Sequence, residues 1–314
     1  MPDPIALVTR LDRAEEEAWL AALAAAMPDE TFVPFRALEP ARYGDVRIAV
    51  VANPEPADVA RLANLAFVQS LWAGVERLVA DLGPDAPPIV RMTDPELART
   101  MAEAALAWTL YLQRDMPAYA DQQRRRVWRQ RPYRKPADVT VGLLGLGALG
   151  LAAARTMVRA GFRVVGWSRR PKELVGVETC SGEAGLADLL ARSDIVVCLI
   201  PLTPATRGLL DAGRLAGVKR GAALINFARG PIVVEADLLA ALDSGSLHHA
   251  VLDVFDAEPL PASSPLWSRP DVTVLPHVSA PTAHRSAAEV VGRNVRRFRR
   301  EGRVPDAVDM GRGY

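Results

Sequence analysis

The chain has 314 residues, half of them hydrophobic, and its 38 Lys and Arg against 37 Asp and Glu give a formal net charge of +1. This length is typical of two domains, and the apolar, nearly neutral composition excludes a disordered chain. It also argues against nucleic-acid binding through bulk positive charge, so we expect no nucleic-acid partner.

Short apolar runs alternate with helix-like segments over the first seventy residues. Each run is too short for a helix and is followed by turn or helix-start residues, which predicts buried strands. The predicted strands are 5–8, 32–35, 47–52 and 66–71, and the predicted helices between them include 13–27 and 56–63. This alternation is typical of βαβ units, which build a parallel sheet.

A long helix is predicted to follow and to join this unit to a second one. Thr93-Asp-Pro-Glu96 matches the capping-box pattern, and an apolar stripe at helical spacing then runs from Leu97 to Leu112. The next predicted strands are 139–144, 163–167, 195–200, 222–226, 249–254 and 272–275. The sequence therefore predicts two α/β units, and the stripe of Ala288, Val291, Val295 and Phe298 predicts a C-terminal helix.

Neither a membrane segment nor a secretion signal is expected. No run approaches 18 uninterrupted apolar residues, and Met1-Pro-Asp-Pro4 lacks a basic segment followed by an apolar core. The two cysteines, Cys180 and Cys198, cannot form a disulfide framework. We therefore expect no membrane partner and a location in the reducing cytoplasm.

The strongest local motif is a glycine loop. Gly145, Gly147 and Gly150 form G-x-G-x-x-G after a predicted strand and before the predicted helix 151–160. In a dinucleotide site the first glycine allows a tight turn, the second lets the backbone approach a pyrophosphate, and the third lets helix and strand pack closely. The alternative is a glycine turn without a ligand.

The next predicted strand indicates which dinucleotide would bind. An NAD site usually carries an acid about 20 residues after the glycines, whereas this strand ends in Ser168, Arg169 and Arg170. An acid repels a 2′-phosphate and a guanidinium binds it, so NADP is preferred over NAD, which stays possible. The alternative is that these arginines are only solvated.

Three polar residues follow strands of the second unit. Arg229 comes after 222–226, Glu258 after the strand that ends near residue 254, and His277 after 272–275. A histidine suits proton transfer to a carbonyl oxygen beside a nicotinamide, and parallel strands end at one sheet edge. The alternative is a packed histidine and a surface acid. The sequence has no P-loop, H-E-x-x-H or C-x-x-C motif, so no metal is expected.

Three sequence blocks then carry a family resemblance. They are Asn226–Gly230, Leu252–Pro261 and Pro265-Leu-Trp267 through Pro276-His-Val-Ser-Ala280. In order and spacing they resemble the signature of the D-isomer-specific 2-hydroxyacid dehydrogenases, from about Phe67 to the C-terminus. Within that family the chain is most similar to the glyoxylate/hydroxypyruvate reductase branch, through Gln69–Val75, Trp167–Arg169 and Arg312–Tyr314.

This resemblance implies roles for individual residues. Arg229 would hold the carboxylate and carbonyl oxygen of the substrate, His277 would be the general acid, and Glu258 would orient His277 and favour its protonated form. The loop Ala73, Gly74 and Val75 would bind the carboxylate through backbone N–H groups. Asp253 would bind the nicotinamide carboxamide. Further cofactor contacts would come from Leu149, Pro201, Thr203 and Ala228.

The resemblance also implies two doubly wound domains, a Rossmann nucleotide-binding domain (96–283) inserted into a flavodoxin-like substrate-binding domain (1–95 with 284–314). Closure of the domains would exclude water, and the protein would be a homodimer. One departure concerns the loop after the third strand, where the branch has an aromatic residue and this chain has Ala52-Asn53.

The sequence therefore predicts an NADPH-preferring reductase that converts glyoxylate or hydroxypyruvate to glycolate or D-glycerate. Two alternatives stay open. One is a reductase of larger 2-oxo acids. The other is a nicotinamide-sensing binding protein without turnover, because such relatives keep the same polar residues.

Overall fold

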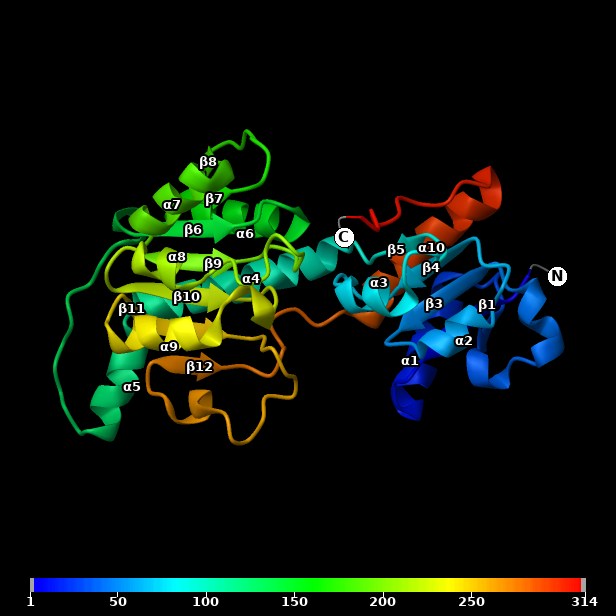
Figure 1. Cartoon of the computed structure of the whole chain (residues 1–314), viewed down its shortest axis with the longest axis horizontal. Helices are drawn as coiled ribbons and strands as arrows, with labels where there is room; N and C mark the ends of the chain where they lie inside the picture. The colour runs from blue at the N-terminus through cyan, green and yellow to red at the C-terminus, as the bar shows by residue number, and fades with distance from the viewer. Residues whose placement is uncertain (1–2, 312–314) are drawn as a thin grey trace. The chain divides into compact units, whose positions relative to one another are not determined.

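A computed structural model of the chain describes residues 3–311. The chain forms two compact units, Met1–Glu96 with Thr282–Tyr314 (unit 1) and Leu97–Pro281 (unit 2) (Figure 1). Unit 2 is thus inserted in the sequence between the two segments of unit 1. Each unit has its own parallel sheet covered by helices, which confirms the predicted fold class. The motif Arg312–Tyr314 lies outside the described residues.

Unit 1 contains a five-stranded parallel sheet in the order β2-β1-β3-β4-β5. The strands are β1 (Ile5–Thr9), β2 (Phe32–Pro34), β3 (Ile48–Ala52), β4 (Phe67–Ser70) and β5 (Ile89–Val90). The strand order reverses between β1 and β3, and open α/β sheets bind ligands at such a reversal. Strand β5 was not predicted, because two residues are too few to show a pattern.

Helices cover both faces of this sheet. One face packs against α1 (Arg13–Ala26) and α10 (His284–Glu301), and the other packs against α2 (Pro56–Ala60) and α3 (Glu76–Leu82). The C-terminal helix therefore completes the core that the N-terminal segment begins, as the contact of Phe67 with Phe298 shows.

Unit 2 contains a seven-stranded parallel sheet in the order β12-β11-β10-β9-β6-β7-β8. The strands are β6 (Thr140–Leu144), β7 (Arg163–Trp167), β8 (Glu178–Cys180), β9 (Ile195–Cys198), β10 (Ala222–Asn226), β11 (Leu247–Leu252) and β12 (Val272–Val274). The order reverses between β6 and β9. Strand β8 was not predicted.

Two helix layers explain why the central strands β9 and β10 are almost entirely apolar. Helices α4 (Pro95–Gln113) and α6 (Ala148–Arg159) cover one face, and α7 (Gly182–Arg192), α8 (Ala212–Ala216) and α9 (Glu235–Asp243) cover the other. A strand buried on both faces has no polar alternation. Cys198 lies fully inside, where burial raises the pKa of its thiol to about 12.

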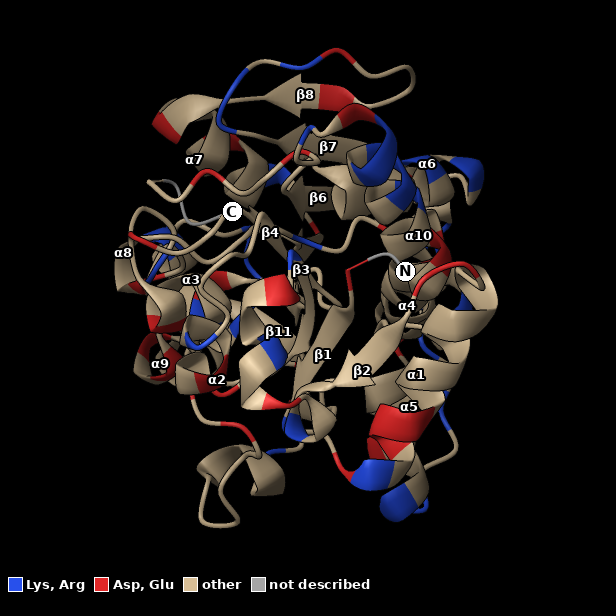
Figure 2. Ribbon diagram, turned by 90° about the vertical axis from the view of Figure 1, so that its right-hand side faces the viewer, with Lys and Arg blue, Asp and Glu red and all other residues tan. Residues whose placement is uncertain are grey.

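The helices at the start of unit 2 also differ from the prediction. The first turn of α4 is capped by Asp94 and not by Thr93, because the Asp94 carboxylate accepts the Glu96 N–H at 2.9 Å. A further helix, α5 (Met116–Arg124), follows α4. Its residues are polar on average, so no apolar stripe at helical spacing indicated it in the sequence. No helix among residues 3–311 is long and apolar enough to cross a membrane. Acidic and basic segments alternate over both units (Figure 2).

Candidate active site

The three polar residues predicted from strand ends follow neighbouring strands of unit 2. Strands β10, β11 and β12 pair in parallel, so their carboxyl ends lie at one edge of the sheet. Arg229 follows β10, Glu258 follows β11 and His277 follows β12. The sheet topology therefore brings them to one edge.

A buried asparagine shapes the Arg229 loop. The Asn226 side chain accepts the Ala228 N–H at 3.1 Å and donates to the Arg229 carbonyl oxygen at 3.1 Å. The half-buried guanidinium of Arg229 donates to the Ala228 carbonyl oxygen at 2.6 Å. Asn226 thus closes the turn that presents Arg229, a role that the sequence motif did not reveal.

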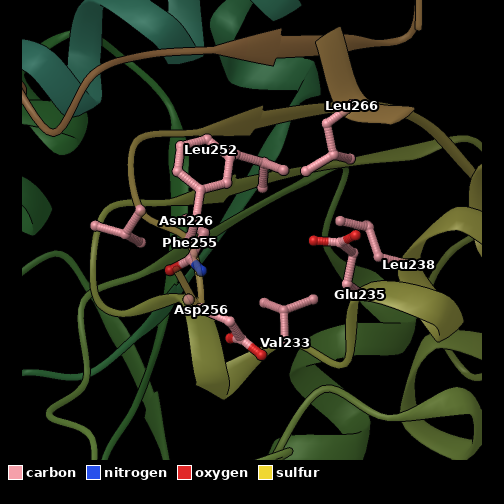
Figure 3. Close-up of a pocket in the computed structure, with 10 residues that line it drawn as sticks. Asn226, Val233, Glu235, Leu238, Leu252, Phe255, Asp256 and Leu266 are labelled. Carbon is pink, nitrogen blue, oxygen red and sulfur yellow. The ribbon is translucent and has the colours of Figure 1, made fainter. Parts of the chain in front are cut away.

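The loops after β10 and β11 touch at Gly230. A Cβ atom at Gly230 would lie 2.1 Å from the carbonyl carbon of Phe255, so no side chain fits. Figure 3 shows the small pocket beside this contact, with Asn226, Phe255 and Asp256 in its wall. Arg229, Glu258 and His277 do not line that pocket. The contact at Gly230 has a structural role, since the absence of a side chain lets the Arg229 loop pack on the loop after β11.

Glu258 and His277 form a hydrogen-bonded pair. The Glu258 Oε2 atom lies 2.7 Å from His277 Nδ1, and Oε1 accepts the Phe255 N–H at 2.9 Å. An ionised carboxylate only accepts hydrogen bonds, so Nδ1 is the ring nitrogen that donates to Glu258. Nε2 is then the ring nitrogen that does not bond Glu258. The His277 side chain is 53% exposed. The pair can therefore present an oriented imidazole to a ligand and transfer a proton at Nε2.

A second carboxylate holds the backbone of the His277 loop. Asp253 is 2% exposed, and its two oxygens accept the N–H groups of Val278 at 2.8 Å and Ser279 at 2.9 Å. His277 itself has φ = +53°, a left-handed conformation that non-glycine residues rarely adopt. We call these two hydrogen bonds the Asp253 clamp. By fixing the two residues after His277, the clamp offsets the free-energy cost of the left-handed conformation. The family resemblance implied only a carboxamide contact for Asp253.

The glycine loop fits a dinucleotide pyrophosphate. Gly145 has φ = +103°, and a Cβ at Gly150 would lie 1.8 Å from the Gly145 carbonyl oxygen, so both positions exclude other residues. A Cβ at Gly147 would meet nothing within 4 Å, which leaves open space at the N-terminus of α6. The first N–H groups of a helix bind phosphate oxygens. The residues present therefore fit the group that the motif predicts.

The end of β7 carries hydroxyl and basic groups without an acid. The Ser168 hydroxyl donates to the Arg170 carbonyl oxygen at 2.7 Å, which curls the chain after the strand. Lys172 follows, and its ammonium donates to the Leu146 carbonyl oxygen of the glycine loop at 2.7 Å. Sequence reasoning did not single out Lys172, because only the folded loop brings it to the glycines.

The other predicted contacts lie in two loops. After β9, the Thr206 hydroxyl donates to the Pro201 carbonyl oxygen at 2.7 Å and accepts the Thr203 N–H at 2.8 Å. In unit 1, residues 73–75 lie in the connection between β4 and α3. Within residues 3–311 the backbone N–H groups of this loop donate no hydrogen bond, so they can bind an anion.

We expect Asp253→Asn to loosen the His277 loop. An amide has one accepting oxygen, so its NH₂ group would face a backbone N–H, and a buried donor without an acceptor costs about 1–3 kcal/mol. Unit 2 should lose stability by about this amount. The amides of Val278 and Ser279 should exchange with deuterium faster than in the wild type.

The matched control is Asp256→Asn, in the exposed turn three residues later. It should leave both exchange rates unchanged. Wild-type protection of both amides in Asp253→Asn would show that the clamp does not hold the loop.

The sequence of the chain matches one family model and a curated relative over most of its length. Residues 106–279 match the family model described as D-isomer specific 2-hydroxyacid dehydrogenase, NAD binding domain. A glyoxylate/hydroxypyruvate reductase A of Photorhabdus laumondii is 38% identical over 273 residues, which cover 85% of this chain and 87% of that protein.

Two solved structures resemble the whole chain. A D-isomer specific 2-hydroxyacid dehydrogenase from Xanthobacter autotrophicus, in complex with NADPH and MES, is 43% identical with a TM-score of 0.93 and full coverage of both chains. An NADPH-dependent glyoxylate/hydroxypyruvate reductase from Sinorhizobium meliloti, in complex with NADP and sulfate, is 36% identical with a TM-score of 0.90 and covers 99% of this chain and 100% of its own. The chain belongs to the D-isomer specific 2-hydroxyacid dehydrogenase family.

Proposed function

We propose that the protein is an NADPH-dependent reductase of small 2-oxo acids, which converts glyoxylate to glycolate and hydroxypyruvate to D-glycerate. The observation that carries this proposal is the Glu258–His277 pair on the sheet edge that also carries Arg229. Family membership and the names of the two reductases similar to the chain support the substrate class.

Bound NADPH would supply the hydride. The glycine loop and the N-terminus of α6 would hold its pyrophosphate, and Ser168, Arg169 and Arg170 would bind the 2′-phosphate. We also assign cofactor contacts to the residues that the family resemblance implied, namely Leu149, Pro201, Thr203, Ala228 and Asp253. The open space at Gly147 and the absence of an acid at the end of β7 support this assignment.

The protein's own residues would handle the carboxylate and the proton. The Arg229 guanidinium would bind the substrate carboxylate and polarise its carbonyl oxygen, together with the N–H groups of Ala73, Gly74 and Val75. His277 would donate the proton from Nε2 to that oxygen in reduction and take it back in oxidation. Glu258 would stabilise the imidazolium, since an opposite charge nearby favours the protonated form.

The two units would divide these tasks. We propose unit 1 as the substrate-binding domain and unit 2 as the nucleotide-binding domain, because the glycine loop lies in unit 2 and the anion-binding loop 73–75 in unit 1. We further propose a cytoplasmic location, which two unbridged cysteines in the described residues support.

Steady-state kinetics on a panel of 2-oxo acids tests the function and the cofactor together. A single charge-assisted contact to the 2′-phosphate is worth roughly 1.5–3 kcal/mol, so kcat/KM should be about 10–150-fold higher with NADPH than with NADH. Arg169→Ala should bring the two values together.

Equal efficiency with both cofactors in the wild type would contradict NADPH preference. Turnover of phenylpyruvate but not glyoxylate would point to larger substrates, and absence of any turnover to a binding protein.

Substitutions at the His277–Glu258 pair should separate proton transfer from orientation. His277→Ala should lower kcat by about 10²–10⁴-fold, the usual contribution of general acid catalysis. Glu258→Gln should cost less and should move the pH at which reduction falls off to lower values, because the imidazolium loses its carboxylate. Reduction needs the protonated imidazole, so the variant should retain more activity at pH 6 than at pH 8.

The measurement is kcat/KM for glyoxylate against pH, with Asp256→Asn as a control that removes a nearby exposed acid. A pH profile that Glu258→Gln leaves in place, with less than about a tenfold loss in His277→Ala, would falsify the proposed roles.

We also propose a homodimer formed through unit 2. The segment after α5 runs along the outside of this unit (Figure 1), and it exposes Trp128 fully and Tyr133 by 60%. Large exposed aromatic side chains are typical of interfaces. Light scattering should give twice the 33.9 kDa of one chain, and Trp128→Glu should lower that mass. The mass of a single chain in the wild type would contradict the proposal.

A further inference from the structure

A buried amide lies in the core between the unit 1 sheet and its C-terminal helix. Phe67 and Leu71 belong to the apolar cluster that the sheet shares with α10, and Gln69 lies between them on the same face of the chain. The Gln69 side chain is fully buried. A buried amide without hydrogen-bond partners costs free energy, so the partners of Gln69 explain why this core tolerates it.

Three hydrogen bonds fix the orientation of the Gln69 amide. Its Nε2 atom donates to the carbonyl oxygens of Ser70 at 2.9 Å and Val90 at 3.2 Å. Carbonyl oxygens only accept hydrogen bonds, so Oε1 must face the other way. There it accepts the Asn294 Nδ2–H at 2.8 Å. Asn294, on α10, therefore sets the direction in which Gln69 donates.

The Ser70 carbonyl oxygen is open to Gln69 because β4 leaves the sheet at this residue. If the parallel ladder of β4 with β5 continued in register, this oxygen would accept the Met92 N–H. The Met92 N–H donates instead to the Trp72 carbonyl oxygen at 3.0 Å. The Gln69 amide thus replaces a main-chain donor at the point where the strand becomes a loop.

The hydroxyl group of Ser70 holds the next residues. Its Oγ atom accepts the Trp72 N–H at 3.0 Å and donates to the Trp72 carbonyl oxygen at 3.1 Å. Residues 73–75 follow directly, and within residues 3–311 their N–H groups donate no hydrogen bond. Ser70 therefore holds the main chain twice just before this loop, through its carbonyl oxygen and through its hydroxyl group.

We propose that Gln69 and Asn294 are positioning residues of the reductase, which hold the end of β4 in the course that presents the N–H groups of residues 73–75 to the substrate carboxylate. This inference rests on the proposed function, in which that loop binds the carboxylate. Gln69 is buried and acts through the Ser70 carbonyl oxygen, and Asn294 acts through Gln69. The C-terminal helix thereby contributes to substrate binding from inside the core.

Gln69→Met tests the proposal, because methionine keeps the length of the side chain and removes both donors. The Ser70 carbonyl oxygen then loses its partner, so KM for glyoxylate should rise about 3–10-fold, which corresponds to one hydrogen bond. The kcat and the KM for NADPH should stay within about twofold, since only ground-state and transition-state binding of the carboxylate weaken together. Asn294→Asp, whose carboxylate cannot donate to Gln69, should also raise KM for glyoxylate.

A double variant separates positioning from stability. Gln69→Met with Asn294→Leu replaces both polar partners by apolar side chains, which should restore much of the stability that the single variants lose. The KM for glyoxylate should stay raised, because the Ser70 carbonyl oxygen still lacks its donor. Recovery of both the thermal stability and the KM in the double variant would overturn the proposal, since the role of the pair would then be structural alone.

The matched control is Arg299→Met, on the same helix. The Arg299 guanidinium binds the two Glu30 carboxylate oxygens at 3.1 and 3.0 Å, so its loss should also destabilise unit 1 but should keep the wild-type KM. If the wild type reduces glyoxylate and its KM stays within about twofold in Gln69→Met and Asn294→Asp, the positioning role is wrong and the proposed function stands. If the wild type reduces neither glyoxylate nor hydroxypyruvate, both are overturned.

Discussion

A buried carboxylate at the end of β11 accepts two consecutive N–H groups from the loop after β12, and the candidate site depends on this contact. It fixes the backbone where His277 adopts a left-handed conformation. Five residues after Asp253, on the same connection, Glu258 fixes the imidazole ring itself. One strand end thus supplies an anchor for the loop and an anchor for the side chain. Orientation of the ring then needs no ligand.

Both units use their sheets in the same way. In each, parallel strands buried between helix layers end at an edge where the strand order reverses, and the polar groups gather there. In unit 2 that edge carries the open space at Gly147, and in unit 1 it carries a pocket lined by Arg10, Asn53 and Trp72 among others. The rigid core leaves the chemistry to short loops, whose course is set by glycines and by side chains that bond to the backbone.

Local patterns were enough to predict most strands, the glycine loop and the residues after β10, β11 and β12, because apolar periodicity and motif spacing are local. The Asp253 clamp could not be predicted, since it depends on the register between β11 and β12, which brings together residues 25 and 26 positions apart. The same holds for the hydrogen bond from the Trp72 indole N–H to Asn53 Oδ1, which joins residues 19 positions apart. The family resemblance implied an aromatic residue near Ala52-Asn53 that this chain lacks.

Nitrogen-15 NMR of histidine-labelled protein tests the central claim, that Glu258 fixes the tautomer of His277, most directly. The described chain has four histidines, so His277 can be assigned with a single His277→Gln variant. At high pH the account predicts a neutral ring protonated at Nδ1, in contrast to the Nε2-protonated form that free histidine favours, and a loss of this preference in Glu258→Gln. A neutral His277 protonated at Nε2 in the wild type would contradict it.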